Sequence, residues 1–163
     1  MKAGSGRVEE GDKQMRCVVQ RVTEAAVTVD GEITGSIGPG MLALIGVSTE
    51  DTDADLKYIA EKVMHLRIYD DENGVMNRSV LEAGGSILAV SQFTLYGDAR
   101  GGRRPSYFRA AKPEKASGMY ERMIAFWRAQ GIHVETGRFR TEMKVSLVND
   151  GPVTILLDSE KAF

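Results

Sequence analysis

The sequence predicts a single α+β domain, with a mixed, largely antiparallel sheet curled towards a barrel and two main helices. Three observations predict this class. The chain has 163 residues, of which 42% are hydrophobic and 27% charged, as expected for one globular domain. Strand patterns outnumber helical patterns along the chain. The two helical patterns are not spaced as repeating strand-helix-strand units, which argues against a parallel α/β sheet.

The first expected elements are strands joined by a tight turn. Residues 17–22 form a short apolar strand. Residues 25–29 then face residues 32–37 across Asp30 and Gly31, a dipeptide suited to a two-residue type I′ turn. The sequence therefore predicts a hairpin here.

A buried strand and two helices follow. Residues 41–47 (MLALIGV) are apolar without alternation, as in a strand buried on both faces. Apolar side chains recur at helical spacing over residues 52–66, where Thr52 offers an N-cap, and again between Pro113 and Gly131, which suit a helix start and a helix end. Further strands are expected at residues 67–69, 86–95, 143–148 and 153–157, the last two paired around a turn at residues 149–152.

The first fourteen residues do not resemble the rest of the chain. They contain three apolar residues among glycine, serine and charged residues, whereas periodic apolar sequence starts at Met15. We therefore expect a disordered extension or tag over residues 1–14 and one domain over residues 15–163.

Charge and composition exclude several classes of partner. Twenty-one Lys and Arg against twenty-three Asp and Glu give 21 − 23 = −2, so no broad positive surface exists to wrap long nucleic acid. One cysteine and two histidines leave too few ligands for a Cys/His zinc site and allow no internal disulfide. No apolar run reaches the roughly 20 residues of a membrane span. We expect a cytoplasmic protein without metal or cofactor.

Familiar catalytic motifs are absent from the sequence. No G-x-S-x-G elbow and no phosphate-binding G-x-x-x-x-G-K-[ST] loop occurs. Cys17 lies in an apolar strand, where an inert core thiol is expected more often than a nucleophile. The sequence disfavours triad hydrolysis, nucleotide hydrolysis and hydride transfer.

Polar residues end the strand expected at residues 86–95. Ser91, Gln92, Phe93, Thr94 and Leu95 place three polar side chains where a buried strand would be apolar. They either bond the neighbouring backbone or present amide N–H groups and a hydroxyl to a ligand, an arrangement that stabilises an oxyanion.

Residues 149–154 (NDGPVT) form the second candidate functional segment. Composition alone indicates a hairpin turn. The Gly151-Pro152 pair adds conformational freedom at glycine and an X-Pro bond, a bond type that is cis in about 5–6% of folded cases. A fixed cis bond there would be informative.

Together these segments resemble the D-aminoacyl-tRNA deacylase (D-tyrosyl-tRNA deacylase) family. The resemblance runs from residue 15 to about residue 158, and the extension 1–14 and the tail 159–163 depart from it. It implies hydrolysis of the ester of D-aminoacyl-tRNA and of glycyl-tRNA, with release of tRNA and rejection of L-aminoacyl-tRNA. The stretches in family order are 18–22 (VVQRV), 76–77, 91–95, 104–106, 136–139 and 149–154.

The resemblance also implies roles for the segment at residues 91–95. Ser91, Gln92, Phe93 and Thr94 form the catalytic segment, in which the amides of Phe93 and Thr94 face the substrate carbonyl oxygen and the ribose 2′-hydroxyl helps to activate water. Thr94 is the competing candidate as a nucleophile. We rank this alternative lower, because a threonine without an adjacent base has a hydroxyl pKa too high to attack.

By the same resemblance, Gly151 and Pro152 form a cis pair that enters the active site of a partner subunit and rejects L-amino acids. Arg21 is implied to pin this pair, although a plain surface arginine is the alternative. An obligate homodimer follows from such an exchange. The substrate-binding positions implied with them are Leu95, Asn149, Val153 and Thr154.

A basic loop over residues 100–109 is the candidate tRNA contact. It holds four arginines and two aromatic residues, and Arg103 and Arg104 are the contacts we expect with the acceptor end. A solvated loop is the alternative. At the level of the whole protein, the alternative function is a non-catalytic RNA-binding module that uses this loop.

Overall fold

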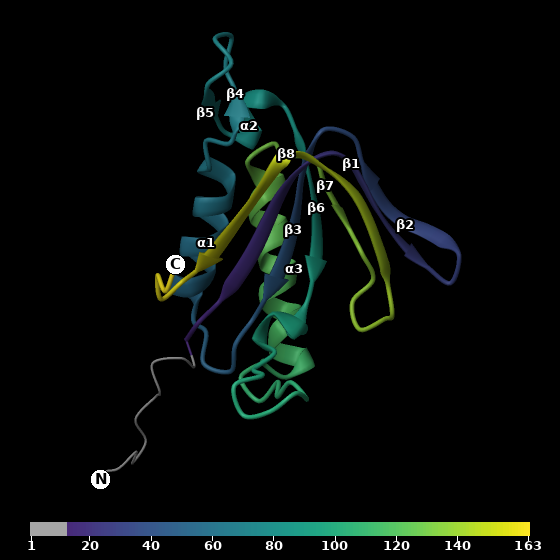
Figure 1. Cartoon of the computed structure of the whole chain (residues 1–163), viewed down its shortest axis with the longest axis vertical. Coiled ribbons are helices and arrows are strands. Elements are labelled where there is room, and N and C mark those ends of the chain that lie inside the picture. Colours follow the sequence, from purple (N-terminus) through teal and green to yellow (C-terminus); the bar gives the residue numbers. More distant parts are fainter. Residues whose placement is uncertain (1–12) are drawn as a thin grey trace.

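The structure is a computed structural model that describes residues 13–163. Within that range, no helix is both long and apolar enough to cross a membrane. The strands are β1 (Arg16–Val29), β2 (Glu32–Ile37), β3 (Gly40–Gly46), β4 (Tyr69–Asp70), β5 (Met76–Arg78), β6 (Ser86–Ser91), β7 (Val134–Thr136) and β8 (Lys144–Asp158), and the helices are α1 (Asp53–His65), α2 (Val80–Ala83), the 3₁₀ helix η2 (Phe93–Tyr96) and α3 (Pro113–Ala129) (Figure 1).

The main sheet is mixed and largely antiparallel, as the sequence predicts. Its order is β2-β1-β3-β6-β7, with β8 on the other edge of β1. β3 and β6 pair in parallel, as do β6 and β7, whereas every pair that includes β1 is antiparallel. A Cβ added to Gly35 in β2 would lie 2.3 Å from the carbonyl oxygen of Thr136 in β7. The two ends of the path therefore approach each other, and the sheet forms a nearly closed barrel.

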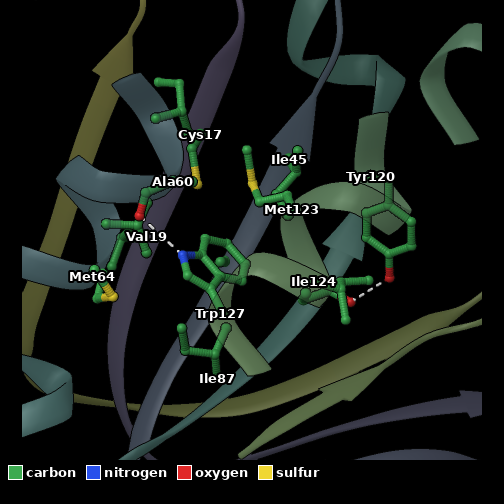
Figure 2. Packing of buried hydrophobic residues seen from close by; sticks show 14 of the residues in the cluster. Cys17, Val19, Ile45, Ala60, Met64, Ile87, Tyr120, Met123, Ile124 and Trp127 are labelled. Atoms are coloured by element: carbon green, nitrogen blue, oxygen red, sulfur yellow. Dashed lines mark hydrogen bonds between the residues drawn. The ribbon is translucent and has the colours of Figure 1, made fainter. Parts of the chain in front are cut away.

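Buried side chains form two clusters on opposite faces of this sheet. Leu42 and Val90 belong to the cluster enclosed by the curled strands, and Ile45 belongs to the cluster beneath the helices. β3 contributes to both clusters, which confirms the expectation of a strand buried on both faces. In the second cluster the indole N–H of Trp127 donates to the carbonyl of Ala60 at 2.9 Å, which joins α3 to α1 (Figure 2).

The two main helices lie where the sequence predicts them. α1 begins after Thr52, whose backbone N–H and hydroxyl both donate to the Asp55 carboxylate. α3 has Pro113 in its first turn and is followed by Gly131, which has a φ of 91°. The one-turn helix α2 is an addition that apolar periodicity could not reveal.

The expected strands over residues 17–22 and 25–29 are one continuous strand, β1. The sequence suggests a break because Thr23 and Glu24 are polar. In the structure both are exposed residues within β1. β8 pairs with β1 on both sides of this point, from Arg16 opposite Asp158 to Thr28 opposite Lys144. The hairpin from β1 to β2 is confirmed, with positive φ at both turn residues, 50° at Asp30 and 81° at Gly31.

Two further expectations about strands are wrong. The strand predicted over residues 86–95 ends at Ser91, and the apolar residues that suggested its continuation belong to η2. The hairpin predicted around residues 149–152 is a bulge within β8, because this strand pairs with β1 before and after it. In β1, Gln20 pairs with Thr154 and Val22 pairs with Asn149, so one residue separates the two pairs. In β8, four residues (150–153) separate them.

The expected extension over residues 1–14 falls mostly outside the described residues. Of its two described residues, Gln14 is only 8% exposed. Its backbone N–H donates to the Ser48 hydroxyl at 2.8 Å, and its side-chain amide donates to Asp158 at 2.6 Å. Gln14 therefore packs against the domain, one residue before its expected start.

The near contact of β2 with β7 predicts that Gly35→Ala destabilises the fold. The added methyl group would force the two strands apart, which we expect to lower the free energy of unfolding by about 1–3 kcal/mol. Urea denaturation measures this change. Gly38→Ala is the matched control, because a Cβ there meets nothing within 4 Å. Equal stability of the two variants would contradict closure of the barrel at Gly35.

Candidate functional site

The first candidate segment lies where β6 passes into η2. The backbone N–H of Gln92 donates to the carbonyl of Ile45 at 2.7 Å, which extends the pairing with β3 by one residue beyond Ser91. The chain then turns into η2, which starts at Phe93. The polar residues that the sequence singles out therefore lie at a strand end, as expected.

The η2 turn presents backbone amides to the surface. In a 3₁₀ helix the first amides have no carbonyl within the helix to which they can donate, and Phe93 and Thr94 hold these positions. The first internal bond is from the N–H of Leu95 to the carbonyl of Gln92 at 3.3 Å. Phe93 and Thr94 are both exposed. The site can therefore offer two adjacent N–H donors to an oxygen of a ligand.

The Thr94 hydroxyl has a carboxamide as its hydrogen-bond partner. The side-chain amide of Gln92 donates to Thr94 Oγ1 at 2.9 Å. A carboxamide does not take up a proton at neutral pH. This contact orients the hydroxyl without activating it.

Tyr96 anchors the far end of η2 to the sheet. Its side chain is buried, and its hydroxyl lies 2.7 Å from the carbonyl oxygen of Gln14 and 2.8 Å from that of Gly46. Burial raises the pKa of this phenol, so the hydroxyl keeps its proton and remains a donor. The turn is thereby held against β3 and the first described residues.

The second candidate segment is the bulge of β8. The Asn149 side chain closes it, because Oδ1 accepts from the backbone N–H of Val153 at 2.7 Å and Nδ2 donates to the hydroxyl of Thr154 at 3.1 Å. The Gly151-Pro152 peptide is cis, and both residues are exposed. The φ of Gly151 is 142°, a conformation that L side chains rarely adopt.

Arg21 lies opposite this bulge and bonds to it. Its Nε donates to the carbonyl of Asp150 at 2.9 Å, and its Nη1 donates to the carbonyl of Ile68 at 2.6 Å. The carboxylates of Asp70 and Asp150 lie 3.9 and 3.8 Å from its nitrogens. The side chain is 13% exposed. Arg21 therefore joins the bulge to the start of the β4-β5 hairpin.

The basic loop lies beside η2. The rings of Phe93 and Tyr107 meet edge to face, with centroids 5.2 Å apart. Arg103 and Arg104 are exposed on the loop, whereas Arg100 is paired with the Asp98 carboxylate, whose pKa it lowers. The structure thus brings the expected tRNA contacts close to the segment at residues 91–95.

The two candidate segments do not meet within one chain. Arg16, whose guanidinium bonds to Leu95, marks the position of η2 along β1, and Arg21 marks the position of the bulge. Five residues of extended strand span roughly 17 Å. A single chain therefore holds the two segments apart.

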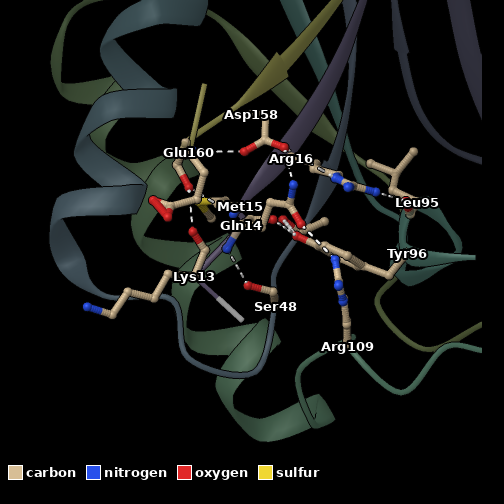
Figure 3. A network of polar contacts seen from close by, with 12 residues as sticks. Lys13, Gln14, Met15, Arg16, Ser48, Leu95, Tyr96, Arg109, Asp158 and Glu160 are labelled. Atoms are coloured by element: carbon tan, nitrogen blue, oxygen red, sulfur yellow. Dashed lines mark hydrogen bonds and ion pairs between the residues drawn. The ribbon is translucent and has the colours of Figure 1, made fainter. Parts of the chain in front are cut away.

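Sequence reasoning missed two residues that hold η2 in place, Arg16 and Tyr96. Both are part of a polar network that includes Gln14 and Arg109 (Figure 3). A hollow of about 400 Å³ lies beside them, lined also by residues 97–100. An arginine at the start of a buried strand was the available signal, but the same pattern is common at sheet edges.

Comparisons with known proteins agree with this architecture. The family model described as D-Tyr-tRNA(Tyr) deacylase matches residues 18–158. A D-aminoacyl-tRNA deacylase of Symbiobacterium thermophilum is 63% identical over 149 residues, which cover 91% of this chain and 99% of the relative. One of Thermus aquaticus is 55% identical over 147 residues, or 90% of this chain and 97% of the relative.

Solved structures show the same fold. The c-Myc DNA unwinding element binding protein aligns with a TM-score of 0.82 and 40% identity, over 87% of this chain and 97% of its own. A probable eukaryotic D-amino acid tRNA deacylase aligns with a TM-score of 0.77 over 89% of this chain and 99% of its own. At 18% identity, this second likeness concerns the fold alone.

Proposed function

This chain belongs to the D-Tyr-tRNA(Tyr) deacylase family and is a hydrolase that deacylates D-aminoacyl-tRNA, and we propose that main-chain groups carry out both its chemistry and its selection of substrate. The observation that carries the proposal is the η2 turn, which offers the amides of Phe93 and Thr94 at the end of β6. We infer that glycyl-tRNA is also a substrate and that the enzyme acts in the cytoplasm, where aminoacyl-tRNA is made.

The reaction requires little chemistry from side chains. The ester between an amino acid and the terminal ribose is already activated, so the protein needs to position it and to stabilise the oxyanion that forms. The two adjacent amides of η2 suit this task, because each N–H can donate to the carbonyl oxygen of the ester. The ribose 2′-hydroxyl of the substrate then helps to activate the attacking water.

Direct attack by a side chain is the competing mechanism. The Thr94 hydroxyl is bonded to the carboxamide of Gln92, which is no base, so this contact does not raise its nucleophilicity. Cys17 is fully buried, and burial raises the pKa of its thiol to about 12. Both groups therefore lack the activation that a nucleophile needs, and hydrolysis by water is favoured.

We propose that Gly151 and Pro152 select the D configuration by exclusion. Both residues are exposed on the bulge, where their backbone atoms can meet the substituents of the substrate α-carbon. An L side chain would collide with rigid main chain, whereas a D side chain would point away. Glycine has no side chain and passes the filter. Such a filter ignores the identity of the D side chain.

The contacts around the bulge support its rigidity. Arg21 holds the carbonyl of Asp150, and Asn149 holds both the N–H of Val153 and the hydroxyl of Thr154. In this proposal, Arg21 positions the filter, and Asn149, Val153, Thr154 and Leu95 shape the surroundings of the substrate.

The distance between the two segments supports a homodimer. If both act on one substrate, they must come from different subunits, because β1 keeps them roughly 17 Å apart within one chain. β8 carries exposed apolar side chains at Val148 (48%) and Leu156 (50%), on either side of the bulge. We therefore propose that β8 faces a second copy of the chain and delivers Gly151 and Pro152 to its η2 turn.

The basic loop completes the proposed site. Arg103 and Arg104 are exposed next to the aromatic pair of Phe93 and Tyr107, so phosphates and bases of the acceptor end can bind beside the reacting ester. The alternative function, a non-catalytic RNA-binding module, rests on this same loop and requires no turnover.

Incubation with D-tyrosyl-tRNA and L-tyrosyl-tRNA tests the proposal. We expect release of D-tyrosine with a preference over L-tyrosine on the order of 100-fold or more, because a rigid backbone excludes the L side chain. Acid precipitation of labelled aminoacyl-tRNA gives the rates. Binding of tRNA that weakens in an Arg103→Met/Arg104→Met variant, without any D-selective release by the wild type, would establish the RNA-binding alternative instead.

Removal of the two candidate nucleophiles is expected to leave hydrolysis in place. Cys17→Ala and Thr94→Ala should each retain kcat within about tenfold of the wild type, since neither group is activated. Single-turnover rates with D-tyrosyl-tRNA measure this. Complete loss of turnover in either variant, with the circular dichroism of the wild type, argues for a covalent mechanism.

Gly151→Ala is expected to impair the filter. The new methyl group would lie 2.7 Å from Cγ2 of Val153 at a φ of 142°, so the bulge must shift. We expect a loss of activity, or of D over L preference, by about tenfold or more, with the melting temperature little changed. Gly118→Ala on α3, where a Cβ meets nothing within 4 Å, is the control.

Light scattering of the same samples gives the oligomeric state. A fully active monomer would refute completion of the site across subunits. Full activity and full D preference in Gly151→Ala would refute the filter.

A further inference from the structure

We propose that Arg16 is a positioning residue of the active site, which holds the carbonyl of Leu95 and thereby fixes the turn that presents the Phe93 and Thr94 amides. This inference rests on the proposed function of η2. Neither the sequence motifs nor the family resemblance points to Arg16.

The guanidinium of Arg16 contacts two successive residues of η2. Its Nη1 donates to the carbonyl oxygen of Leu95 at 3.0 Å, and its Cζ lies 5.4 Å from the centroid of the Tyr96 ring (Figure 3). Arg16 is the first residue of β1, where the strand pairs with the end of β3 and the end of β8. A side chain from the sheet thus supports η2 directly after its two amide donors.

A buried carboxylate forms an ion pair with this guanidinium. Asp158 lies opposite Arg16 in β8, its side chain is 0% exposed, and its Oδ2 is 3.6 Å from Arg16 Nε. Gln14 Nε2 donates to Asp158 Oδ2 at 2.6 Å, and the N–H of Glu160 donates to Oδ1 at 2.7 Å. The carboxylate is therefore fixed from two sides, and its negative charge is held beside the Arg16 guanidinium.

Gln14 connects the same network to the rest of η2 and to the basic loop. Its carbonyl accepts from the Tyr96 hydroxyl, and its side-chain oxygen accepts from Arg109 Nη1 at 3.1 Å. Two anchors therefore act on adjacent residues of the turn, Arg16 on Leu95 and Gln14 on Tyr96. Together they fix both the height of η2 above the sheet and its rotation.

The position of these anchors has a consequence for catalysis. Donors to an oxyanion must lie within a few tenths of an ångström of their best position, and a misplacement of about 1 Å can cost about 100-fold in rate. Thr94 directly precedes Leu95, so rotation of the Leu95 peptide moves the amides before it. Loss of the Arg16 bond would free that rotation.

An arginine is suited to this role in a way that a lysine is not. The planar guanidinium donates Nη1 to Leu95 and keeps Nε 3.6 Å from the Asp158 carboxylate, an ion pair without a hydrogen bond, whereas a single ammonium lacks this fixed pair of directions. A merely structural role would require only a positive charge beside Asp158. In that case Arg16→Lys would keep the activity of the wild type.

Arg16→Lys and Arg16→Met test the proposal. For Arg16→Lys, which keeps a charge beside Asp158, we expect a folded protein whose kcat falls about 10- to 100-fold with KM changed less than about threefold. Arg16→Met should lose at least as much. In Arg16→Ala the removed side chain leaves a space that ethylguanidinium can fill, so we expect added ethylguanidinium to restore part of kcat. Arg122→Met, which removes an exposed pair with Asp53 between α3 and α1, is the control.

Hydrogen exchange provides a readout independent of activity. The amides of Leu95 and Gly97 bond within the turn, and that of Gln92 bonds to Ile45. We expect these amides to exchange about tenfold faster in Arg16→Lys, whereas the sheet amide of Ile87, bonded to His133, keeps its rate.

Wild-type kcat and unchanged exchange in Arg16→Lys would overturn the proposal. A loss of kcat with unchanged exchange at residues 92–97 would also overturn it, because Arg16 would then act by another route. If exchange rises as expected but the wild type deacylates no D-aminoacyl-tRNA, the proposed function fails and the support of η2 by Arg16 stands.

Discussion

The antiparallel pairing of β1 with β8 is the constraint on which both candidate segments depend. The ladder runs from Arg16 opposite Asp158 to Thr28 opposite Lys144. At its first step it places an arginine and a buried carboxylate beneath η2. Further along, the four residues between Asn149 and Thr154 face the single residue Arg21, so they have to leave the ladder. One strand pair thus sets the position of the proposed oxyanion donors and of the proposed filter.

Main-chain chemistry gives a coherent account of the site. The groups assigned to catalysis and selection are amides and backbone atoms, and the polar side chains around them serve to hold these atoms still. Arg21 and Asn149 hold the bulge, while Arg16 and Tyr96 hold the turn. Preorganised dipoles need no reorganisation during the reaction, which is the physical reason that such support matters.

Much of the fold could be predicted from local sequence, because its signals are local. Apolar periodicity and capping residues indicated α1 and α3, and Asp30-Gly31 indicated the first hairpin. The continuity of β8 could not be predicted, because residues 149–152 have the composition of a turn and their pairing partner lies more than a hundred residues away. The sequence predicts a strand as far as Leu95 because Phe93 and Leu95 are apolar, whereas both residues belong to η2. Family motifs indicated residues 91–94 and Arg21, whereas Arg16 carries no motif, and its contacts exist only after folding.

Because the bulge of β8 lies outside the β1–β8 ladder, the distance to which the proposed filter projects is independent of the barrel. Asn149 and Thr154 both pair with β1, and the residues between them make no pairing contact with it. Residues 150–153 can therefore change in number or type while the strand register on either side persists. A change in the size of the accepted acyl group would then require no redesign of the scaffold.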